Sequence, residues 1–249
     1  MSIDVIIPCG PNDEDIIHRS ISSALKYVVD VRRVYVIAHK IMDLSNAIVI
    51  PETSFPFTKA QVIEKTSERR GGWYLQQLLK FYAPLLLEGC SKSVLWLDAD
   101  TVFNKRVRFM EQGKYLMNMT REIHVPYFDH MLRLHPTFTV WKKLMSGITN
   151  CMIVNTDILA ELMAKVEAQY EGREFWEIFL ETVTEKMNSG ASEYEIYFHY
   201  LMNTHAEKAR LRPLRWHNFG QRADKTIQGD WDYVCYHSYN QRKVPLFSR

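Results

Sequence analysis

Two aspartates that directly follow an apolar run are the strongest chemical signal in the chain. Residues 94–97 read Val-Leu-Trp-Leu, and Asp98, Ala99 and Asp100 come next. Such a run is typical of a buried strand in a parallel sheet, and ligands bind just beyond the carboxyl ends of those strands. Two carboxylates at that place are costly unless a positive charge neutralises them. Because a hard divalent cation with oxygen ligands usually accompanies phosphates, the sequence predicts a metal–phosphate site here.

A second polar group lies on the helix expected over residues 73–87. Trp73, Gln77 and Lys80 share one face of this helix, whereas leucines on the opposite face belong to the core. Arg70 and two glycines precede the helix, and loose glycines beside arginines suit an anion site at a helix N-terminus. A solvated helix face preceded by a loop is the plain alternative.

Acids and a histidine late in the chain are candidates for proton transfer and metal binding. Glu193 and Glu195 open another expected helix, and either carboxylate could act as a base toward an acceptor hydroxyl. The simpler interpretation of Glu195 is a capping box with Ser192. His237 ends an apolar run and is an ordinary hydrogen-bonded histidine unless a cation already binds Asp100. In that case imidazole and carboxylates together form a good manganese site.

The spacing of apolar residues predicts the elements that position these groups. Strands are expected over residues 3–8, 34–38, 47–50, 94–97, 123–128, 151–155 and 232–237. Helices are expected after a cap at Asp13, over 73–87, after a cap at Thr156-Asp157, and over 173–187 and 193–205. The order strand–helix–strand–strand begins an open α/β sheet. Since no repeat or linker interrupts the pattern, a single domain is expected.

Composition and charge exclude several classes of protein. The chain has 249 residues, 47% of them hydrophobic and 24% charged, which is ordinary for a soluble globular protein. A formal charge of +2 gives no reason to expect nucleic-acid binding. No apolar run reaches the roughly 20 residues of a transmembrane segment, and no secretion signal is visible. The four cysteines are scattered, so we expect reduced thiols in a soluble cytoplasmic protein that could also work at the cytosolic membrane face.

Taken together, these segments resemble the GT-A-fold, nucleotide-sugar-dependent glycosyltransferases. The likeness rests on the strand 3–8, the segment Arg-Gly-Gly-Trp-Tyr-Leu-Gln-Gln over 70–77, the Asp-Ala-Asp strand end, residues 147–155 and the late histidine. The chain is similar in particular to small bacterial and viral glycosyltransferases with an R-G-G-W-Y-x-Q-Q segment, and more distantly to the glycogenin-like group. The resemblance implies an α/β fold of the GT-A (Rossmann-like) type, with a mixed, mostly parallel sheet flanked by helices. It also implies one domain over 1–249, with a nucleotide-binding half to about residue 105 and an acceptor-binding half over about 106–249.

The resemblance further implies roles for matching residues. Asp98, Asp100 and His237 would bind Mn2+ or Mg2+, and Asp98 would also lie near the ribose. The remaining contacts to the nucleotide sugar would come from residues at two strand ends and one helix, namely Pro8, Cys9, Gly10, Arg70, Trp73, Gln77, Lys80 and Ala99. Asn-Cys-Met over 150–152 departs from the N-x-G that is common there, which leaves the donor-sugar contacts of that strand open.

The implied activity is transfer of a sugar from a UDP- or GDP-sugar to a hydroxyl of a glycan or related acceptor. If the reaction inverts the anomeric centre it needs a base, for which Glu193 comes first and Glu195 or Asp129 next. Two other classes stay open. One is a haloacid-dehalogenase-type phosphatase, with Asp98 as nucleophile, Asp100 as acid/base and a second acidic pair over residues 230–232. The other is an inactive module that binds sugar nucleotides or glycans. Donor, acceptor, stereochemistry and oligomeric state are not readable from the sequence.

Overall fold

A five-stranded sheet forms the centre of the computed structural model, which describes residues 2–219 and 229–236. The strand order is β3-β2-β1-β4-β8, and the strands are β1 (Ile3–Cys9), β2 (Val31–Ala38), β3 (Ile48–Pro51), β4 (Ser93–Leu97) and β8 (Cys151–Asn155). The first four strands of this order run parallel, and β8 pairs antiparallel with β4 at the edge. The predicted mixed, mostly parallel sheet is therefore confirmed.

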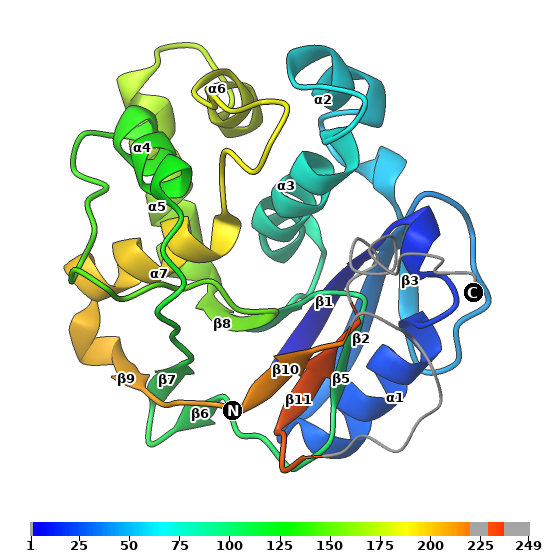
Figure 1. The fold of residues 1–249 in the computed structure, drawn as a ribbon. Coiled ribbons are helices and arrows are strands. Elements are labelled where there is room, and N and C mark those ends of the chain that lie inside the picture. The colour runs from blue at the N-terminus through cyan, green and yellow to red at the C-terminus, as the bar shows by residue number, and fades with distance from the viewer. Residues whose placement is uncertain (1, 220–228, 237–249) are drawn as a thin grey trace, which may run out of the picture.

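Helices cover both faces of this sheet (Figure 1). Helix α1 packs against β2, and α3 packs on β1 from the other side. The helices are α1 (Ile17–Tyr27), α2 (Lys59–Lys65), α3 (Gly71–Leu86), α4 (Val125–Leu134), α5 (Thr156–Gln169), α6 (Phe175–Glu181) and α7 (Glu193–Thr204). Because both faces are covered, β1 and β4 are buried along their whole length, which explains their unbroken apolar runs.

Two small sheets extend the central one. The first has the order β10-β11-β5, and the second has the order β6-β7-β9. Their strands are β5 (Thr101–Phe103), β6 (Met110–Glu111), β7 (Lys114–Met117), β9 (Ala209–Leu211), β10 (Trp216–Asn218) and β11 (Tyr233–Cys235). Strand β11 pairs antiparallel with β5, so Cys235 lies opposite Thr101 and Tyr233 opposite Phe103. The expected late strand is thus present and returns beside the Asp-Ala-Asp turn.

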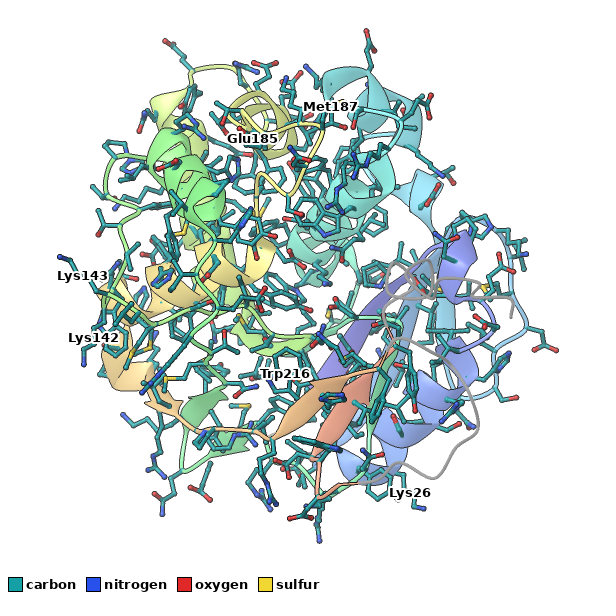
Figure 2. All side chains as sticks on the ribbon, viewed as in Figure 1. Lys26, Lys142, Lys143, Glu185, Met187 and Trp216 are labelled. Carbon is teal, nitrogen blue, oxygen red and sulfur yellow. The ribbon has the colours of Figure 1, made fainter. Side chains whose placement is uncertain are left out.

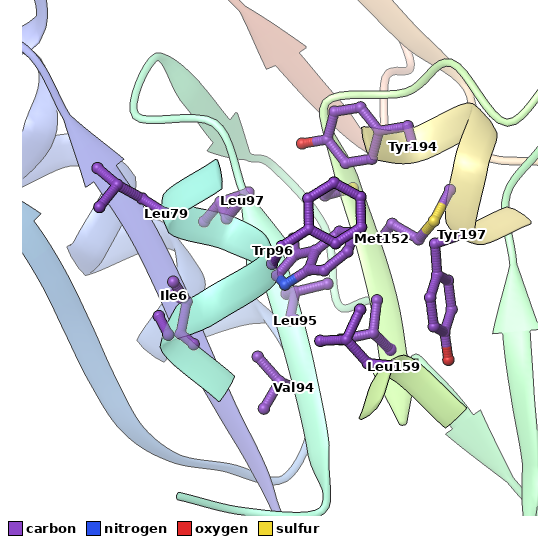
Figure 3. Close-up of a cluster of buried hydrophobic side chains, with 14 of the residues drawn as sticks. Ile6, Leu79, Val94, Leu95, Trp96, Leu97, Met152, Leu159, Tyr194 and Tyr197 are labelled. Atoms are coloured by element: carbon purple, nitrogen blue, oxygen red, sulfur yellow. The ribbon is translucent and has the colours of Figure 1, made fainter. Parts of the chain in front are cut away.

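One continuous core ties β4 to the helices around it. Trp96 is fully buried, and its ring meets Phe81 of α3 at 5.4 Å and Tyr197 of α7 at 5.6 Å between centroids. Figure 3 shows Trp96 of β4 beside Met152 of β8 and Tyr194 of α7. Since close-packed interiors allow little movement, this packing holds the carboxyl end of β4 rigidly against α3 and α7.

The strand predicted over 123–128 is wrong, because this segment begins helix α4. Pro126 lies in the first turn, where its missing N–H costs nothing and its fixed φ favours a helix. His130, Met131 and Leu134 then form the buried face, and burial lowers the pKa of His130 to about 3. A short apolar run alone does not distinguish a strand from a helix, which is why this element was misassigned.

Three helix boundaries also differ from the prediction. Helix α1 begins at Ile17 with no side-chain cap, so the cap predicted at Asp13 is wrong. The N-cap of α5 is Asn155, whose side chain accepts a hydrogen bond from the Ile158 N–H at 3.0 Å, rather than Thr156-Asp157. Helix α6 ends at Glu181, several residues before the predicted end. Helix α2 was not predicted at all.

Lysines such as Lys26, Lys142 and Lys143 are exposed and project at the rim (Figure 2). Among the described helices, none has the length and apolar character required to span a bilayer. All four cysteines are free thiols, and three of them are buried.

Candidate functional site

The carboxyl ends of β1 and β4 lie at the same edge of the sheet. The two strands pair in parallel, with Ile6 opposite Trp96, and they end at Cys9 and Leu97. The residues predicted to contact a nucleotide, Pro8 to Gly10, therefore lie at the same edge as the Asp-Ala-Asp turn. A crevice at this edge is where open α/β sheets bind their ligands.

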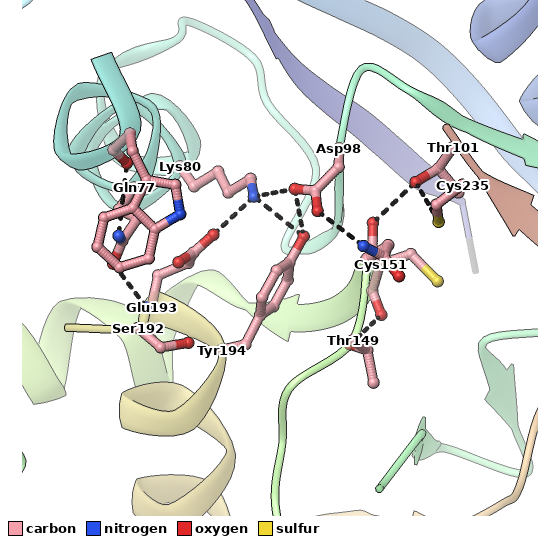
Figure 4. Close-up of polar contacts among 12 residues, drawn as sticks. Gln77, Lys80, Asp98, Thr101, Thr149, Cys151, Ser192, Glu193, Tyr194 and Cys235 are labelled. Carbon is pink, nitrogen blue, oxygen red and sulfur yellow. Dashed lines mark hydrogen bonds and ion pairs between the residues drawn. The ribbon is translucent and has the colours of Figure 1, made fainter. Parts of the chain in front are cut away.

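A buried lysine joins two carboxylates at this edge (Figure 4). The Lys80 ammonium, on α3, donates hydrogen bonds to Asp98 Oδ1 and, at 2.6 Å, to Glu193 Oε1. It also donates to the Tyr194 hydroxyl at 3.0 Å. The Lys80 side chain is 0% exposed and that of Glu193 3%, whereas that of Asp98 is 24% exposed. The sequence thus brings Asp98, Lys80 and Glu193 together from three distant segments.

The pKa values in this cluster follow from burial and mutual charge. Burial by itself lowers the pKa of Lys80, but the adjacent Asp98 and Glu193 carboxylates outweigh that effect and leave the pKa raised. Burial raises the pKa of Glu193, although Lys80 opposes the shift. The pKa of Tyr194 is well above its ordinary value because of burial and the nearby Asp98 charge. Lys80 therefore stays charged, and the Tyr194 phenol remains a proton donor.

Two further groups orient the Asp98 carboxylate. The Tyr194 hydroxyl donates to Asp98 Oδ1 at 2.8 Å, and the Asn150 side-chain amide donates to Oδ2 at 3.3 Å. The Asp98 backbone N–H also donates to the Asn150 carbonyl at 3.0 Å, which continues the ladder between β4 and β8. The carboxylate is thus held from three sides, with part of its surface open to solvent.

The predicted face of α3 is largely buried. Gln77 is 0% exposed, and its side-chain oxygen accepts from the Glu193 backbone N–H at 3.1 Å, so it holds the first turn of α7. The solvated-face alternative is therefore wrong for Gln77 and Lys80. Trp73 is half-buried and stacks at 6.2 Å on Tyr127, with the Arg70 guanidinium 5.3 Å above its ring.

The other candidate bases are placed differently. Glu195 is fully buried, and its carboxylate accepts from the Ser146 hydroxyl at 2.6 Å and the Gly147 N–H at 2.7 Å. Ser192 does cap α7 by accepting from the Glu195 N–H, but the Glu195 side chain does not close the predicted capping box. Asp129 is exposed on α4, and no hydrogen bond or ion pair within the described residues joins it to Asp98.

The predicted metal ligands are only partly described. Ala99 and Asp100 are buried at the strand end, and the Asp100 carbonyl accepts from the Tyr236 N–H at 3.1 Å. His237, the third predicted ligand, lies outside the described residues. In the part of the chain that is described, no group of three or more His, Cys, Asp or Glu side chains is arranged to hold a metal ion.

The second acidic pair needed by the phosphatase alternative lies elsewhere. Asp230 forms ion pairs with Lys105 and Arg215, and the Asp232 carboxylate accepts from the Arg215 N–H at 2.7 Å. Both acids come just before β11, whose first residue, Tyr233, pairs with Phe103 at the end of β5. Asp100 precedes the opposite end of β5. Three paired residues, about 10 Å of strand, therefore separate them from the Asp-Ala-Asp turn.

Sequence reasoning missed Asn150 and Tyr194 as partners of Asp98. Asn150 was noted only as a departure from a common pattern, and Tyr194 lies inconspicuously between two glutamates. The one available signal was the position of Tyr194 in the first turn of a helix that already held a candidate base.

The loop before β8 approaches α7 so closely that it needs a glycine. A Cβ at Gly147 would lie 2.8 Å from the Tyr194 carbonyl and closer still to Phe198. We expect Gly147→Ala to lower the free energy of unfolding by about 1–3 kcal/mol, as overpacking does. Gly72→Ala is the matched control, since nothing lies within 4 Å of that position in α3, and it should leave stability unchanged or slightly higher. Urea denaturation measures both, and equal midpoints would contradict the close approach.

The fold as a whole is similar to that of a known glycosyltransferase. The apo crystal structure of mouse xyloside xylosyltransferase 1 superposes with a TM-score of 0.50 at 8% sequence identity. The match covers 96% of this chain and 99% of the mouse chain. At this identity the likeness establishes a glycosyltransferase-like, Rossmann-related fold.

Sequence comparison supplies the family. No curated protein matches the chain. The model of DUF6492, described as a family of unknown function, matches residues 23–231. Because this match covers most of the sequence, including β4, α3 and α7, the chain belongs to the DUF6492 family.

Proposed function

We propose that this protein is a metal-dependent glycosyltransferase that moves a sugar from a nucleotide-diphosphate sugar to a hydroxyl of a glycan or related acceptor. The observation that carries the proposal is the cluster of Asp98, Lys80 and Glu193 at the carboxyl edge of the sheet. A buried charged cluster at the ligand-binding edge of such a sheet is a typical functional site. The chain-wide likeness to a xylosyltransferase fold favours sugar transfer among the chemistries that the cluster could serve.

The donor set fits a hard divalent cation. Asp98 and Asp100 supply carboxylate oxygens, the ligands that Mn2+ and Mg2+ prefer. The single charge of Lys80 is shared by Asp98 and Glu193, so a cation that binds Asp98 would add positive charge to a cluster with one more carboxylate than ammonium groups. We assign Asp98 and Asp100 as metal ligands and His237 as the third. When bound, the ion would stabilise the negative charge that develops on the leaving diphosphate.

The protein's own residues would position the reactants. Lys80, Tyr194 and Asn150 fix the orientation of Asp98, so this carboxylate needs no rearrangement when ligands bind. We assign Pro8, Cys9 and Gly10 to the nucleotide, because they lie at the end of β1, at the same edge of the sheet as this turn. The remaining donor contacts are assigned to Arg70 and Trp73 at the start of α3 and to Ala99 at the strand end. Gln77 and Lys80 are fully buried, so we assign them to positioning Glu193 and Asp98.

Among the three candidate bases, Glu193 fits best. Its carboxylate lies in the cluster with Asp98 and Lys80, and burial raises its pKa, which makes it a stronger base toward a hydroxyl. Glu195 already accepts two hydrogen bonds from the loop before β8, and Asp129 lies exposed on α4. The anomeric configuration of the product decides whether a base is needed, since a retaining reaction can proceed without one.

Given four free cysteines, we propose the cytoplasm as the compartment.

A panel of sugar nucleotides tests the proposal. With Mn2+, we expect one UDP- or GDP-sugar to release its nucleoside diphosphate, slowly to water and faster with the right acceptor, and EDTA should abolish the release. Steady phosphate release from a generic phosphate ester would support the phosphatase alternative instead. Tight calorimetric binding of a sugar nucleotide without any turnover would support the binding module.

A further inference from the structure

A pocket of about 390 Å³ lies away from the Asp-Ala-Asp turn. It is lined by the segment between β5 and β6, by β9 and the residues after it, and by Asp232 before β11. Asp232 adjoins Tyr233, which pairs with Phe103 at the far end of β5, whereas Asp100 adjoins the other end. The short strand β5 therefore separates the two sites by about 10 Å.

The lining of this pocket carries excess positive charge. Its charged residues are four arginines and two acids, namely Arg106, Arg108, Arg210, Arg212, Glu111 and Asp232. Arg210 pairs with Glu111 at 2.8 Å, and Arg108 pairs with Asp30 at 3.5 Å. The Asp232 carboxylate accepts a hydrogen bond from the backbone of Arg215. Arg106 and Arg212 are left without an ion pair within the described residues.

Arg212 is half-buried, and part of its guanidinium lacks hydrogen-bond partners. Its guanidinium lies 5.2 Å from the centre of the Phe109 ring, and its Nε and Nη2 atoms are buried without a hydrogen-bond partner among the described residues. Burial lowers the pKa of this guanidinium, but an arginine stays charged in proteins. N–H groups of a charged side chain that are buried without a hydrogen-bond partner cost free energy. A negatively charged ligand that supplied acceptor oxygens would offset this cost.

We propose that this pocket binds the phosphate group of a ligand, with Arg106 and Arg212 as its anchors. Arg106 is exposed at the pocket, and the guanidinium of the half-buried Arg212 lies over the Phe109 ring, so together they offer an accessible and a partly desolvated guanidinium. The planar fork of arginine matches two phosphate oxygens at once, which lysine cannot do. The pocket is separate from the proposed metal site, and the inference does not depend on glycosyl transfer.

Calorimetric titration with inorganic pyrophosphate in EDTA tests this inference. Without a divalent cation the proposed metal site should contribute little, and the Asp100→Asn variant should bind the probe as wild type does. Arg106→Ala is expected to weaken binding about tenfold, the loss of one charge-assisted contact. Arg121→Ala, which removes an exposed arginine outside the pocket, should have no effect. Arg212→Lys keeps the charge but loses the fork, and should also weaken binding.

Vesicles separate two sources of the phosphate group. Arg106-dependent binding to phosphatidic acid vesicles, with none to phosphatidylcholine vesicles, would assign the pocket to a lipid headgroup. Saturable, Arg106-dependent binding of free pyrophosphate alone would assign it to a soluble phosphorylated ligand. The inference is overturned if neither probe binds, or if Arg106→Ala and Arg121→Ala bind both probes equally. Because Arg106 is exposed, its replacement should not prevent folding, and the test stays decisive even if Arg212→Lys is unstable.

Discussion

Replacing Lys80 by methionine is expected to lower the free energy of unfolding by about 3–5 kcal/mol. This is the usual cost of removing one partner from a buried ion pair, because the other charge is left without compensation. Methionine retains most of the lysine stem, so packing changes little. Asp98 and Glu193 would then lie close together with no ammonium between them, and Glu193 is almost fully buried. Urea denaturation at neutral pH measures the loss.

Lys92→Met is the matched control for this prediction. Lys92 pairs with Asp157 at 2.9 Å, but both side chains are well exposed, so its loss should cost about 0–1 kcal/mol. A Glu193→Gln change in the Lys80→Met background should recover part of the lost stability, since it removes one of the two unpaired carboxylates. If Lys80→Met were as stable as Lys92→Met, the buried cluster would be refuted.

Acidification gives an independent check on the same cluster. The pKa of Glu193 is raised in the folded state, and removing Lys80 should raise it further. The folded Lys80→Met variant therefore binds a proton at the Glu193 carboxylate more tightly than the unfolded chain does. As the pH falls through the folded pKa toward the unfolded value of 4.5, the stability deficit of Lys80→Met relative to wild type should therefore shrink.

Local pattern was enough to predict the strands that carry the site. The runs that became β1, β4 and β8 were readable because a strand buried on both faces needs apolar residues at nearly every position. The antiparallel pairing of β8 with β4 was not readable, since strand direction depends on how the chain returns to the sheet. Helix α4 was misassigned because its first residues form a short apolar run, and Pro126, its only local helix signal, was overlooked.

The site was readable only at its acidic centre. Asp98 and Asp100 stand out because carboxylates directly after a buried strand need an explanation. Lys80 and Glu193 are 113 residues apart, and nothing in either segment shows that they meet. A helical face with a lysine and amides fits both a solvated surface and a buried ion pair, because burial is set by the partner element. The contacts of Tyr194 and Asn150 with Asp98 were hidden for the same reason.

Replacing Asp100 by asparagine is expected to reduce turnover about 10²–10³-fold, provided that the protein is the proposed glycosyltransferase. A preorganised group that stabilises developing charge contributes an effect of this size, and asparagine keeps the shape of the side chain but removes its charge. The hydrogen bond from the Tyr236 N–H goes to the Asp100 backbone, so it survives the change. The measurement is release of the nucleoside diphosphate across a Mn2+ titration.

The metal dependence of this variant distinguishes a ligand from a merely structural residue. Asp100→Asn should need more Mn2+ for half-maximal activity. A variant that is only less stable should keep the wild-type Mn2+ requirement and show a lower maximal activity. Asp157→Asn, at an exposed acid on α5, is the control and should leave turnover unchanged. Full activity of Asp100→Asn at the wild-type Mn2+ requirement would remove Asp100 from the metal site. Asp98 would then be the one carboxylate left among the proposed ligands, and the assignment of the cation to this strand end would fail.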